Sequence, residues 1–124
     1  MTLTTFHTLG ITEDLSSRLA EFGIVTPSPV QAEAIPPILE GRDVLATSQT
    51  GTGKTLAYLL PVLQSIDPEI KGAQKLILAP TQELAVQIVR ESERYGETRG
   101  IGVLGLIGGA AAKRQIEKLK SHPQ

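Results

Sequence analysis

Cysteine is absent from this chain of 124 residues. Its absence excludes disulfide bonds, thiolate zinc sites and a cysteine nucleophile, and it fits a reducing compartment. The sequence also lacks an uninterrupted apolar run of about 18 residues, so it predicts no membrane-spanning helix. The opening stretch MTLTTFHTLG has no basic region followed by a long apolar run, so it is unlike a secretory signal. We expect a soluble, cytoplasmic protein on these grounds.

The sequence has no excess of charge of either sign. Its 12 Lys and Arg and 13 Asp and Glu residues give a formal net charge of −1. This balance excludes a globally basic surface, so any contact with nucleic acid has to be local. Hydrophobic residues make up 40% of the chain, which is enough for a core in one ordinary domain.

Short apolar runs alternate with helical patterns along the chain. Residues 43–47, 75–79 and 101–107 are predicted to be buried strands. Helical patterns occur at residues 12–23, 28–35, 54–65, 82–95 and 110–121. Strands that alternate with helices predict right-handed βαβ units. The predicted fold class is therefore α/β, with a parallel sheet that carries helices on both faces and forms one unit.

The second helical pattern has a defined start and a predicted end. Ser28 can cap the helix, and Pro29 stands at the first helical position, where its missing N–H has no cost. Pro36 and Pro37 are expected to break the helix or change its direction, because a proline ring clashes with the preceding turn. The helix is thus predicted to end before Pro36.

The stretch SQTGTGKT follows the first predicted strand and precedes a predicted helix. It comprises Ser48, Gln49, Thr50, Gly51, Thr52, Gly53, Lys54 and Thr55, all of which are predicted to contact a nucleotide. In a phosphate-binding loop, glycines let backbone N–H groups approach the phosphates closely. The lysine ammonium binds the outer phosphates, and the threonine hydroxyl binds Mg²⁺. Lys54 and Thr55 are therefore the candidate catalytic residues, and Thr55 is the candidate metal ligand.

One departure and one alternative accompany this loop. The usual pattern begins with glycine, where this chain has Ser48. The alternative is an ordinary glycine turn that joins a strand to a helix and leaves Lys54 solvated. The position between a predicted strand and a predicted helix favours phosphate binding, since the helix N-terminus then faces the anion.

Four stretches carry a resemblance to a known family. They are GIVTPSPVQ (23–31), SQTGTGKT (48–55), PTQELAVQ (80–87) and the pair GG (108–109). In this order and at these intervals they resemble the N-terminal part of the first RecA-like domain of DEAD-box ATP-dependent RNA helicases. The resemblance runs from Phe6 to the last residue. It implies that residues 1–124 are part of a RecA-like ATP-binding domain and include no second domain.

The first stretch resembles the Q motif, which in this family recognises adenine. The resemblance assigns Gln31 to the adenine edge, and it adds Thr26 and the isolated aromatic Phe6 to the nucleotide site. A structural alternative is a capping box formed by Ser28 and Gln31, and both roles are compatible. Ile24 replaces the aromatic residue that usually follows the motif's glycine, which removes aromatic packing near the base.

The third and fourth stretches resemble segments that contact the RNA backbone in the family. The implied RNA-binding residues are Pro80, Thr81, Gln82, Gly108 and Gly109. Gln82 replaces the family's arginine, so a charged phosphate contact becomes at most a neutral one. This change predicts weaker or more salt-sensitive RNA binding. The alternative for Thr81 and Gln82 is an ordinary helix start with Thr81 as its cap.

Other parts of the family's catalytic apparatus do not occur in these residues. The sequence contains neither DEAD nor SAT, and it has no second RecA-like domain. The resemblance implies ATP or ADP and Mg²⁺ as cofactors, and RNA and a second RecA-like domain as partners. We expect the intact parent to hydrolyse ATP and these residues alone to bind nucleotide without turnover. An unpaired apolar sheet edge also predicts a homodimer.

Two alternatives from other classes remain open. One is a non-catalytic nucleotide-binding or RNA-interaction module that acts through a partner. The other is an unrelated P-loop enzyme such as a small-molecule kinase. The kinase alternative predicts indifference among nucleotide bases and no role for Gln31, so base selectivity discriminates it from the helicase prediction.

Overall fold

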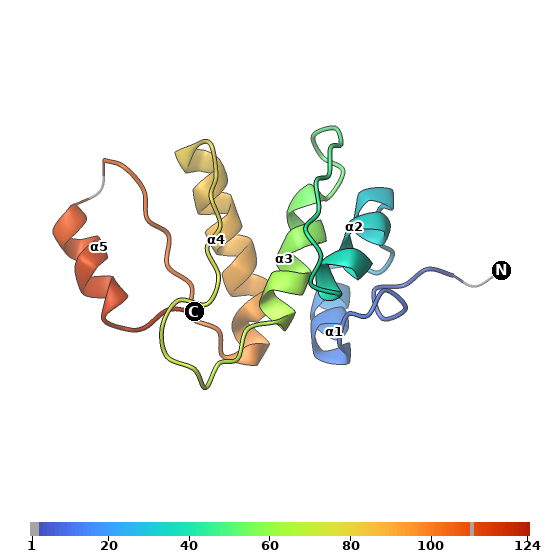
Figure 1. Cartoon of the computed structure of the whole chain (residues 1–124), viewed down its shortest axis with the longest axis horizontal. Helices are drawn as coiled ribbons and strands as arrows, with labels where there is room; N and C mark the ends of the chain where they lie inside the picture. The colour runs from blue at the N-terminus through green and yellow to red at the C-terminus, as the bar shows by residue number, and fades with distance from the viewer. Residues whose placement is uncertain (1–2, 110) are drawn as a thin grey trace. The chain divides into compact units, whose positions relative to one another are not determined.

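The computed structural model describes residues 3–109 and 111–124 (Figure 1). In the described part of the chain, the helices are α1 (Glu13–Glu21), α2 (Pro29–Leu39), α3 (Lys54–Gln64), α4 (Gln82–Gly96), the short 3₁₀ helix η1 (Glu97–Arg99) and α5 (Ala112–Leu119). Each predicted helical pattern is thereby confirmed apart from its exact ends, and residue 110 of the last pattern lies outside the described residues. None of these helices is long and apolar enough to cross a membrane. The chain divides into two compact units, Met1–Ser65 and Ile66–Gln124.

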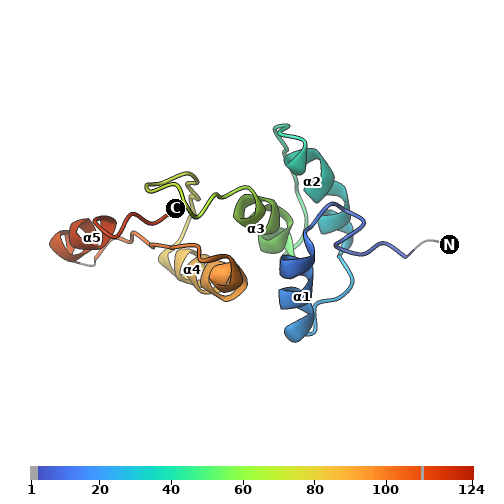
Figure 2. The same ribbon diagram turned by 90° about the horizontal axis from the view of Figure 1, so that it is seen from below.

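Helices α1, α2 and α3 form the first unit, as Figure 2 shows. Leu15 and Leu19 of α1 are fully buried, and so are Leu59 and Leu60 of α3. Burial of each leucine contributes roughly 1.5–3 kcal/mol relative to exposure. The side-chain amide of Gln64 adds a polar link, because it accepts from the N–H of Thr12 at 2.9 Å and donates to the carbonyl of Gly10 at 2.9 Å.

Helix α2 does not end at its prolines. It continues through Pro36 and Pro37 to Leu39, so the predicted break is wrong. Proline already has a helical φ, and the carbonyls of both prolines still accept hydrogen bonds, from Glu40 and Arg42 respectively. The packing of α2 against α3 and the complete burial of Ile35 stabilise the helix despite the missing N–H groups.

The three predicted strands are not formed. No strand occurs among residues 3–109 and 111–124, and the apolar runs lie in segments without regular secondary structure. Leu45 is 95% exposed, Leu76 is 83% exposed and Leu78 is 85% exposed. The expectation that these runs are buried is therefore wrong for their largest side chains, and the parallel sheet is not confirmed.

The backbone of Gln124 forms hydrogen bonds at the start of two of these runs. Its N–H donates to the carbonyl of Gly102 at 3.0 Å, and its carbonyl accepts from the N–H groups of Gln74 at 2.8 Å and Lys75 at 3.0 Å. Backbone from residue 124 thus lies between the start of the 75–79 run and the start of the 101–107 run. At these starts, residue 124 therefore occupies the place beside each run that a paired strand would take.

Helix α4 approaches the 101–107 run closely at one glycine. A Cβ atom built on Gly105 would lie 2.7 Å from Cγ2 of Val89 on α4. Valine in a helix has one strongly preferred rotamer, so this methyl group cannot turn away cheaply. Glycine at position 105 is therefore required by the packing of the run on α4.

We expect Gly105→Ala to lower the free energy of unfolding by roughly 1–3 kcal/mol, as overpacked sites do. Val89→Ala removes the clashing methyl group, so the loss from Gly105→Ala should be smaller in that background. Chemical denaturation of the two single variants and the double variant measures this coupling. Gly108→Ala is the matched control, because the nearest atom to its Cβ would be 3.6 Å away. An equal loss in both backgrounds would contradict the packing argument.

Candidate functional site

The loop SQTGTGKT closes on itself through its own side chains. Gly51 and Gly53 have φ values of 82° and 85°, in the left-handed region that glycine adopts without strain. The hydroxyl of Thr52 donates to the carbonyl of Gln49 at 2.6 Å. Its oxygen also lies 2.6 Å from Oγ of Ser48, so Ser48 donates in that pair. The departure from glycine at position 48 thus adds a hydrogen bond that shapes the loop.

Lys54 and Thr55 are the last two residues of this loop and the first two of helix α3. The ammonium group of Lys54 donates to the carbonyl of Ser48 at 2.7 Å, so it reaches back across the loop. Thr55 is half-buried in the first turn, next to the free N–H groups of the helix N-terminus. Within residues 3–109 and 111–124, no group of three His, Asp or Glu side chains could hold a metal ion. The donor set of an ammonium, a hydroxyl and backbone N–H groups suits a phosphate chain with its Mg²⁺.

Gln31 joins the predicted adenine segment to the phosphate loop. Its Oε1 accepts from the N–H of Ser28 at 2.8 Å, as the capping-box prediction requires. Its Nε2 donates to the carbonyl of Gly53 at 3.1 Å, and the residue is 4% exposed. An amide has two N–H donors and two acceptor lone pairs, so these two bonds use half of its capacity. No sequence signal indicates the contact with Gly53, because the two residues are 22 positions apart.

The other predicted nucleotide residues lie in different environments. Phe6 is 2% exposed, and its ring belongs to the hydrophobic core of the first unit. Its carbonyl accepts from the N–H groups of Leu9 and Ile11, which closes the turn before α1. Thr26 is exposed and Ile24 is half-buried in the stretch that leads into α2. The structure thus joins Gln31 to the loop by a hydrogen bond and holds Phe6 in the core.

The predicted RNA-binding segments meet in the second unit. Thr81 caps α4, because its Oγ1 accepts from the N–H of Leu84 at 3.2 Å. Nε2 of Gln82 donates to the carbonyl of Gly108 at 2.7 Å. The five predicted RNA-contact residues are exposed, namely Pro80, Thr81, Gln82, Gly108 and Gly109. The helix start and the glycine turn therefore form one continuous exposed surface.

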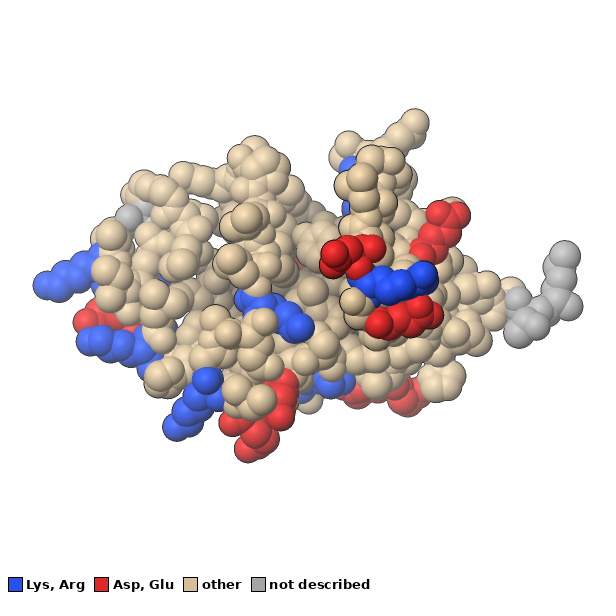
Figure 3. All heavy atoms as spheres, in the orientation of Figure 1, with Lys and Arg blue, Asp and Glu red and all other residues tan. Residues whose placement is uncertain are grey.

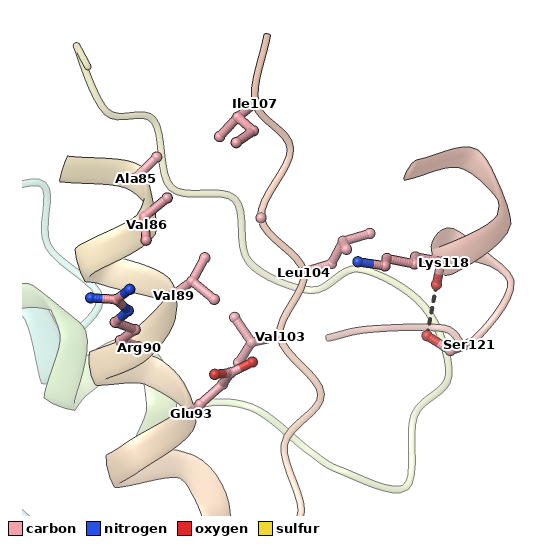
Figure 4. A pocket seen from close by; sticks show the side chains of 11 residues that line it. Ala85, Val86, Val89, Arg90, Glu93, Val103, Leu104, Ile107, Lys118 and Ser121 are labelled. Atoms are coloured by element: carbon pink, nitrogen blue, oxygen red, sulfur yellow. Dashed lines mark hydrogen bonds between the residues drawn. The ribbon is translucent and has the colours of Figure 1, made fainter. Parts of the chain in front are cut away.

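A separate cavity of about 500 Å³ lies in the second unit (Figure 4). Apolar side chains of α4 and of the 101–107 run form its walls, and charged side chains lie at its edge. The lining residues are Ala85, Val86, Val89, Arg90, Glu93, Val103, Leu104, Gly105, Ile107, Lys118 and Ser121. None of the predicted nucleotide or RNA residues lines it, so the cavity is distinct from both candidate sites.

Helix α5 carries most of the basic side chains near the end of the chain. Lys113, Arg114, Lys118 and Lys120 are exposed, and Lys120 forms an ion pair with Glu117 at 2.9 Å. Figure 3 shows basic side chains beside an acidic one at the end where α5 lies. Mixed charge of this kind is typical of a solvated helix face.

Comparison with known proteins decides the family. The chain matches the DEAD/DEAH box helicase family over residues 28–124. This chain belongs to the DEAD/DEAH box helicase family. The helicase chain is 47% identical over 122 residues to the ATP-dependent RNA helicase DeaD of Escherichia coli, covering 98% of this chain and 19% of that protein. It is 57% identical over 95 residues to the DEAD-box ATP-dependent RNA helicase CshC of Bacillus cereus, covering 77% of this chain and 24% of that protein.

Solved structures give the same fold. The RNA helicase Prp28 from Chaetomium thermophilum, bound to ADP, matches 95% of the helicase chain and 30% of its own chain, with a TM-score of 0.84 and 33% identity. A DEAD box protein from Methanococcus jannaschii matches 93% of this chain and 32% of its own, with a TM-score of 0.87 and 28% identity. These likenesses confirm the α/β RecA-like fold class and the family resemblance. The helicase chain spans about a fifth to a quarter of the length of the curated relatives it matches.

The contact between Gln31 and Gly53 can be tested by comparing Gly53→Ala with Gly51→Ala. Both Gly51 and Gly53 are left-handed, so alanine at either position incurs about 1–2 kcal/mol of backbone strain. A Cβ on Gly53 would also strike Nε2 of Gln31, whereas a Cβ on Gly51 meets nothing within 4 Å. We expect Gly53→Ala to lower the free energy of unfolding by about 1–3 kcal/mol more than Gly51→Ala, because it also disrupts a buried hydrogen bond.

Thermal and urea unfolding of the two variants measures this difference. Gln31→Ala removes the obstructing amide, so the two glycine substitutions should have similar effects in that background. Equal losses from Gly51→Ala and Gly53→Ala in the unmodified chain would show that Gln31 does not support the loop.

Proposed function

We propose that this helicase chain is the nucleotide- and RNA-binding part of an ATP-dependent RNA helicase. The observation that carries the proposal is the hydrogen bond from Gln31 to Gly53, since it joins a base-recognising segment to a phosphate loop. The relatives DeaD and CshC are ATP-dependent RNA helicases, and the Prp28 structure is bound to ADP, which supports the same ligand class here. We propose further that both compact units belong to one RecA-like ATP-binding domain, which works with a second RecA-like domain.

In the proposed nucleotide site each group has a separate role. The N–H groups of the loop and of the start of α3 bind the phosphates, and the ammonium of Lys54 leaves the Ser48 carbonyl to bind the outer ones. Gln31 uses its remaining N–H and lone pair for the adenine edge. Mg²⁺ supplies charge neutralisation at the phosphates when bound, and Thr55 is the residue that would hold it.

These residues support binding rather than turnover. Phosphoryl transfer depends on complete positioning and charge stabilisation around the transferred group. The sequence contains neither of the DEAD and SAT motifs that the family resemblance associates with hydrolysis. We therefore propose that these 124 residues bind ATP or ADP and that hydrolysis needs groups other than theirs.

In the proposed RNA site the contacts are to backbone phosphates. The start of α4 offers N–H groups without helical partners, and the Gly108–Gly109 turn lies beside it through the bond to Gln82. Phosphate contacts position a nucleic acid without reading its sequence, so this surface supports binding to RNA of many sequences. Because position 82 has no arginine to form a charged, bidentate phosphate contact, we expect a modest affinity for RNA.

Nucleotide selectivity tests the proposal. In calorimetric titrations we expect Mg-ADP to bind about 2–10-fold more tightly than Mg-GDP, because the base contact adds one or two neutral hydrogen bonds. Gln31→Ala should abolish that preference, and Lys54→Ala should weaken both nucleotides about 10–100-fold through the loss of charged contacts. Lys75→Ala, which changes an exposed lysine outside the loop, should leave both affinities unchanged.

Two results would contradict this proposal. Equal affinity for ADP and GDP, unaffected by Gln31→Ala, would indicate a phosphate-binding loop without adenine recognition. Failure of both nucleotides to bind, while circular dichroism shows the helices intact, would mean that the chain lacks a preformed site.

We also propose that the exposed 75–79 run mediates association between two copies of the chain. Leu76 and Leu78 are two residues apart, so in an extended segment they point to the same side, and both are highly exposed. An apolar extended segment with unpaired backbone groups favours pairing with another chain. The backbone hydrogen bond from Lys75 to Gln124 involves the first residue of the run.

Sedimentation velocity over a concentration series tests this association. We expect a reversible dimer whose dissociation constant rises at least about 10-fold in Leu78→Lys, since a charge in the pairing segment opposes association. Ile70→Lys is the control, because Ile70 is 53% exposed but lies outside the run. A monomer at every concentration would overturn the proposal.

A further inference from the structure

Gln82 occupies the position where the family resemblance expects an arginine, and its side chain has a specific partner. Its Nε2 donates to the carbonyl of Gly108 at 2.7 Å, a short distance for a neutral N–H···O bond. Cβ atoms built on Gly108 and Gly109 would lie 3.6 Å and 4.0 Å from the same nitrogen. The amide therefore lies directly against the turn formed by the two glycines.

The glycine turn depends on a side-chain contact of this kind to hold its conformation. Gly108 and Gly109 are both exposed, and Gly109 has a φ of 81°, so the glycines themselves do little to restrict the turn. On the preceding side, the amide of Gln115 accepts from the N–H of Ile107 at 2.9 Å and donates to its carbonyl at 3.1 Å. Gln115 thus holds the end of the run from α5, and Gln82 holds the turn from α4.

At the start of α4, some hydrogen-bonding groups already bond to the protein, and others can bond to a ligand. Thr81 Oγ1 accepts from Leu84, and the Gln82 amide donates to Gly108, so both side chains are engaged with the protein. Backbone N–H groups in the first turn of a helix have no partners within the helix. The donors left for a phosphate are therefore these N–H groups and the Thr81 hydroxyl, and the bond from Gln82 holds the glycine turn beside them.

We propose that Gln82 is a positioning residue for RNA binding, which fixes the Gly108–Gly109 turn beside the N-terminus of α4 instead of contacting a phosphate itself. The proposal rests on the proposed RNA-binding function of this surface. Compared with the arginine that the family resemblance expects, Gln82 has no positive charge for a phosphate. It still keeps the turn ordered through its hydrogen bond to Gly108.

Four variants of the complete chain test this role. Gln82→Met removes the donor at similar size, Gln82→Glu removes it and adds charge, and Gln82→Arg keeps N–H donors and adds the opposite charge. Gln87→Glu is the matched control, since Gln87 is exposed on the same helix and the charge change is the same. The first measurement is the NMR order parameter of the Gly108 and Gly109 amides without RNA. The second is the affinity for a fluorescent single-stranded RNA at two salt concentrations.

We expect Gln82→Met and Gln82→Glu to lower the order parameters of both glycines from about 0.85 toward 0.6 or less. Both should weaken RNA binding, Gln82→Met by about 3–10-fold with an unchanged salt slope, because no charge is altered. Gln82→Arg should keep the turn ordered and raise RNA affinity with a steeper salt slope, because it adds a cationic phosphate contact. Neutral Gln82 therefore lowers the salt sensitivity of RNA binding, and of the two sequence-based expectations we retain only the weaker binding. Gln87→Glu should leave the order of the turn unchanged.

The order of the turn in the free chain separates positioning from direct contact, because a residue that only touches RNA does not affect it. Unchanged order parameters in Gln82→Met would overturn the proposal. A disordered turn with RNA affinity equal to that of the unmodified chain would overturn it as well. If the unmodified chain binds no RNA while Gln82→Met disorders the turn, the proposed RNA function fails and the contact between Gln82 and Gly108 stands.

Discussion

The hydrogen bond from the Gln31 amide to the Gly53 carbonyl is the contact on which the proposed nucleotide site depends. Gln31 lies in the first turn of α2, and Gly53 directly precedes α3, so the bond links the ends of two helices that pack together. The amide is almost fully buried, and loss of a buried partner costs roughly 1–3 kcal/mol. The position of the phosphate loop therefore depends on the same side chain that the family resemblance assigns to the base.

Side-chain amides have the same connecting role elsewhere in the chain. Gln64 bonds to the backbone at Gly10 and Thr12, and Gln82 bonds to the backbone at Gly108. An amide carries both donors and an acceptor, so it can satisfy backbone groups of an irregular segment that has no ladder or helix of its own. In a chain whose aromatic content is 3%, these bonds hold loops where packing contributes little.

The apolar runs show the limit of local patterns. Residues 75–79 and 101–107 have the composition of buried strands, yet their leucines at 76, 78 and 106 are exposed. A strand is stabilised by side-chain pairs with a neighbouring strand, and here the backbone of Gln124 lies between the starts of the two runs. The likeness to solved RecA-like structures with TM-scores of 0.84 and 0.87 shows that the path of the chain is nevertheless that of the family.

The sequence by itself predicted the helices, the cap at Thr81 and the bond between Ser28 and Gln31, because each depends on residues close together in the chain, and it predicted the family from four motifs in order. Tertiary structure alone decided that α2 continues through its prolines, that Gln31 bonds to Gly53, that Gln82 bonds to Gly108, and that the apolar runs remain unpaired. These outcomes depend on contacts between residues 22 or more positions apart and on the packing of whole helices. Local propensity and spacing carry no information about such contacts, because their free energy arises only after the chain has folded.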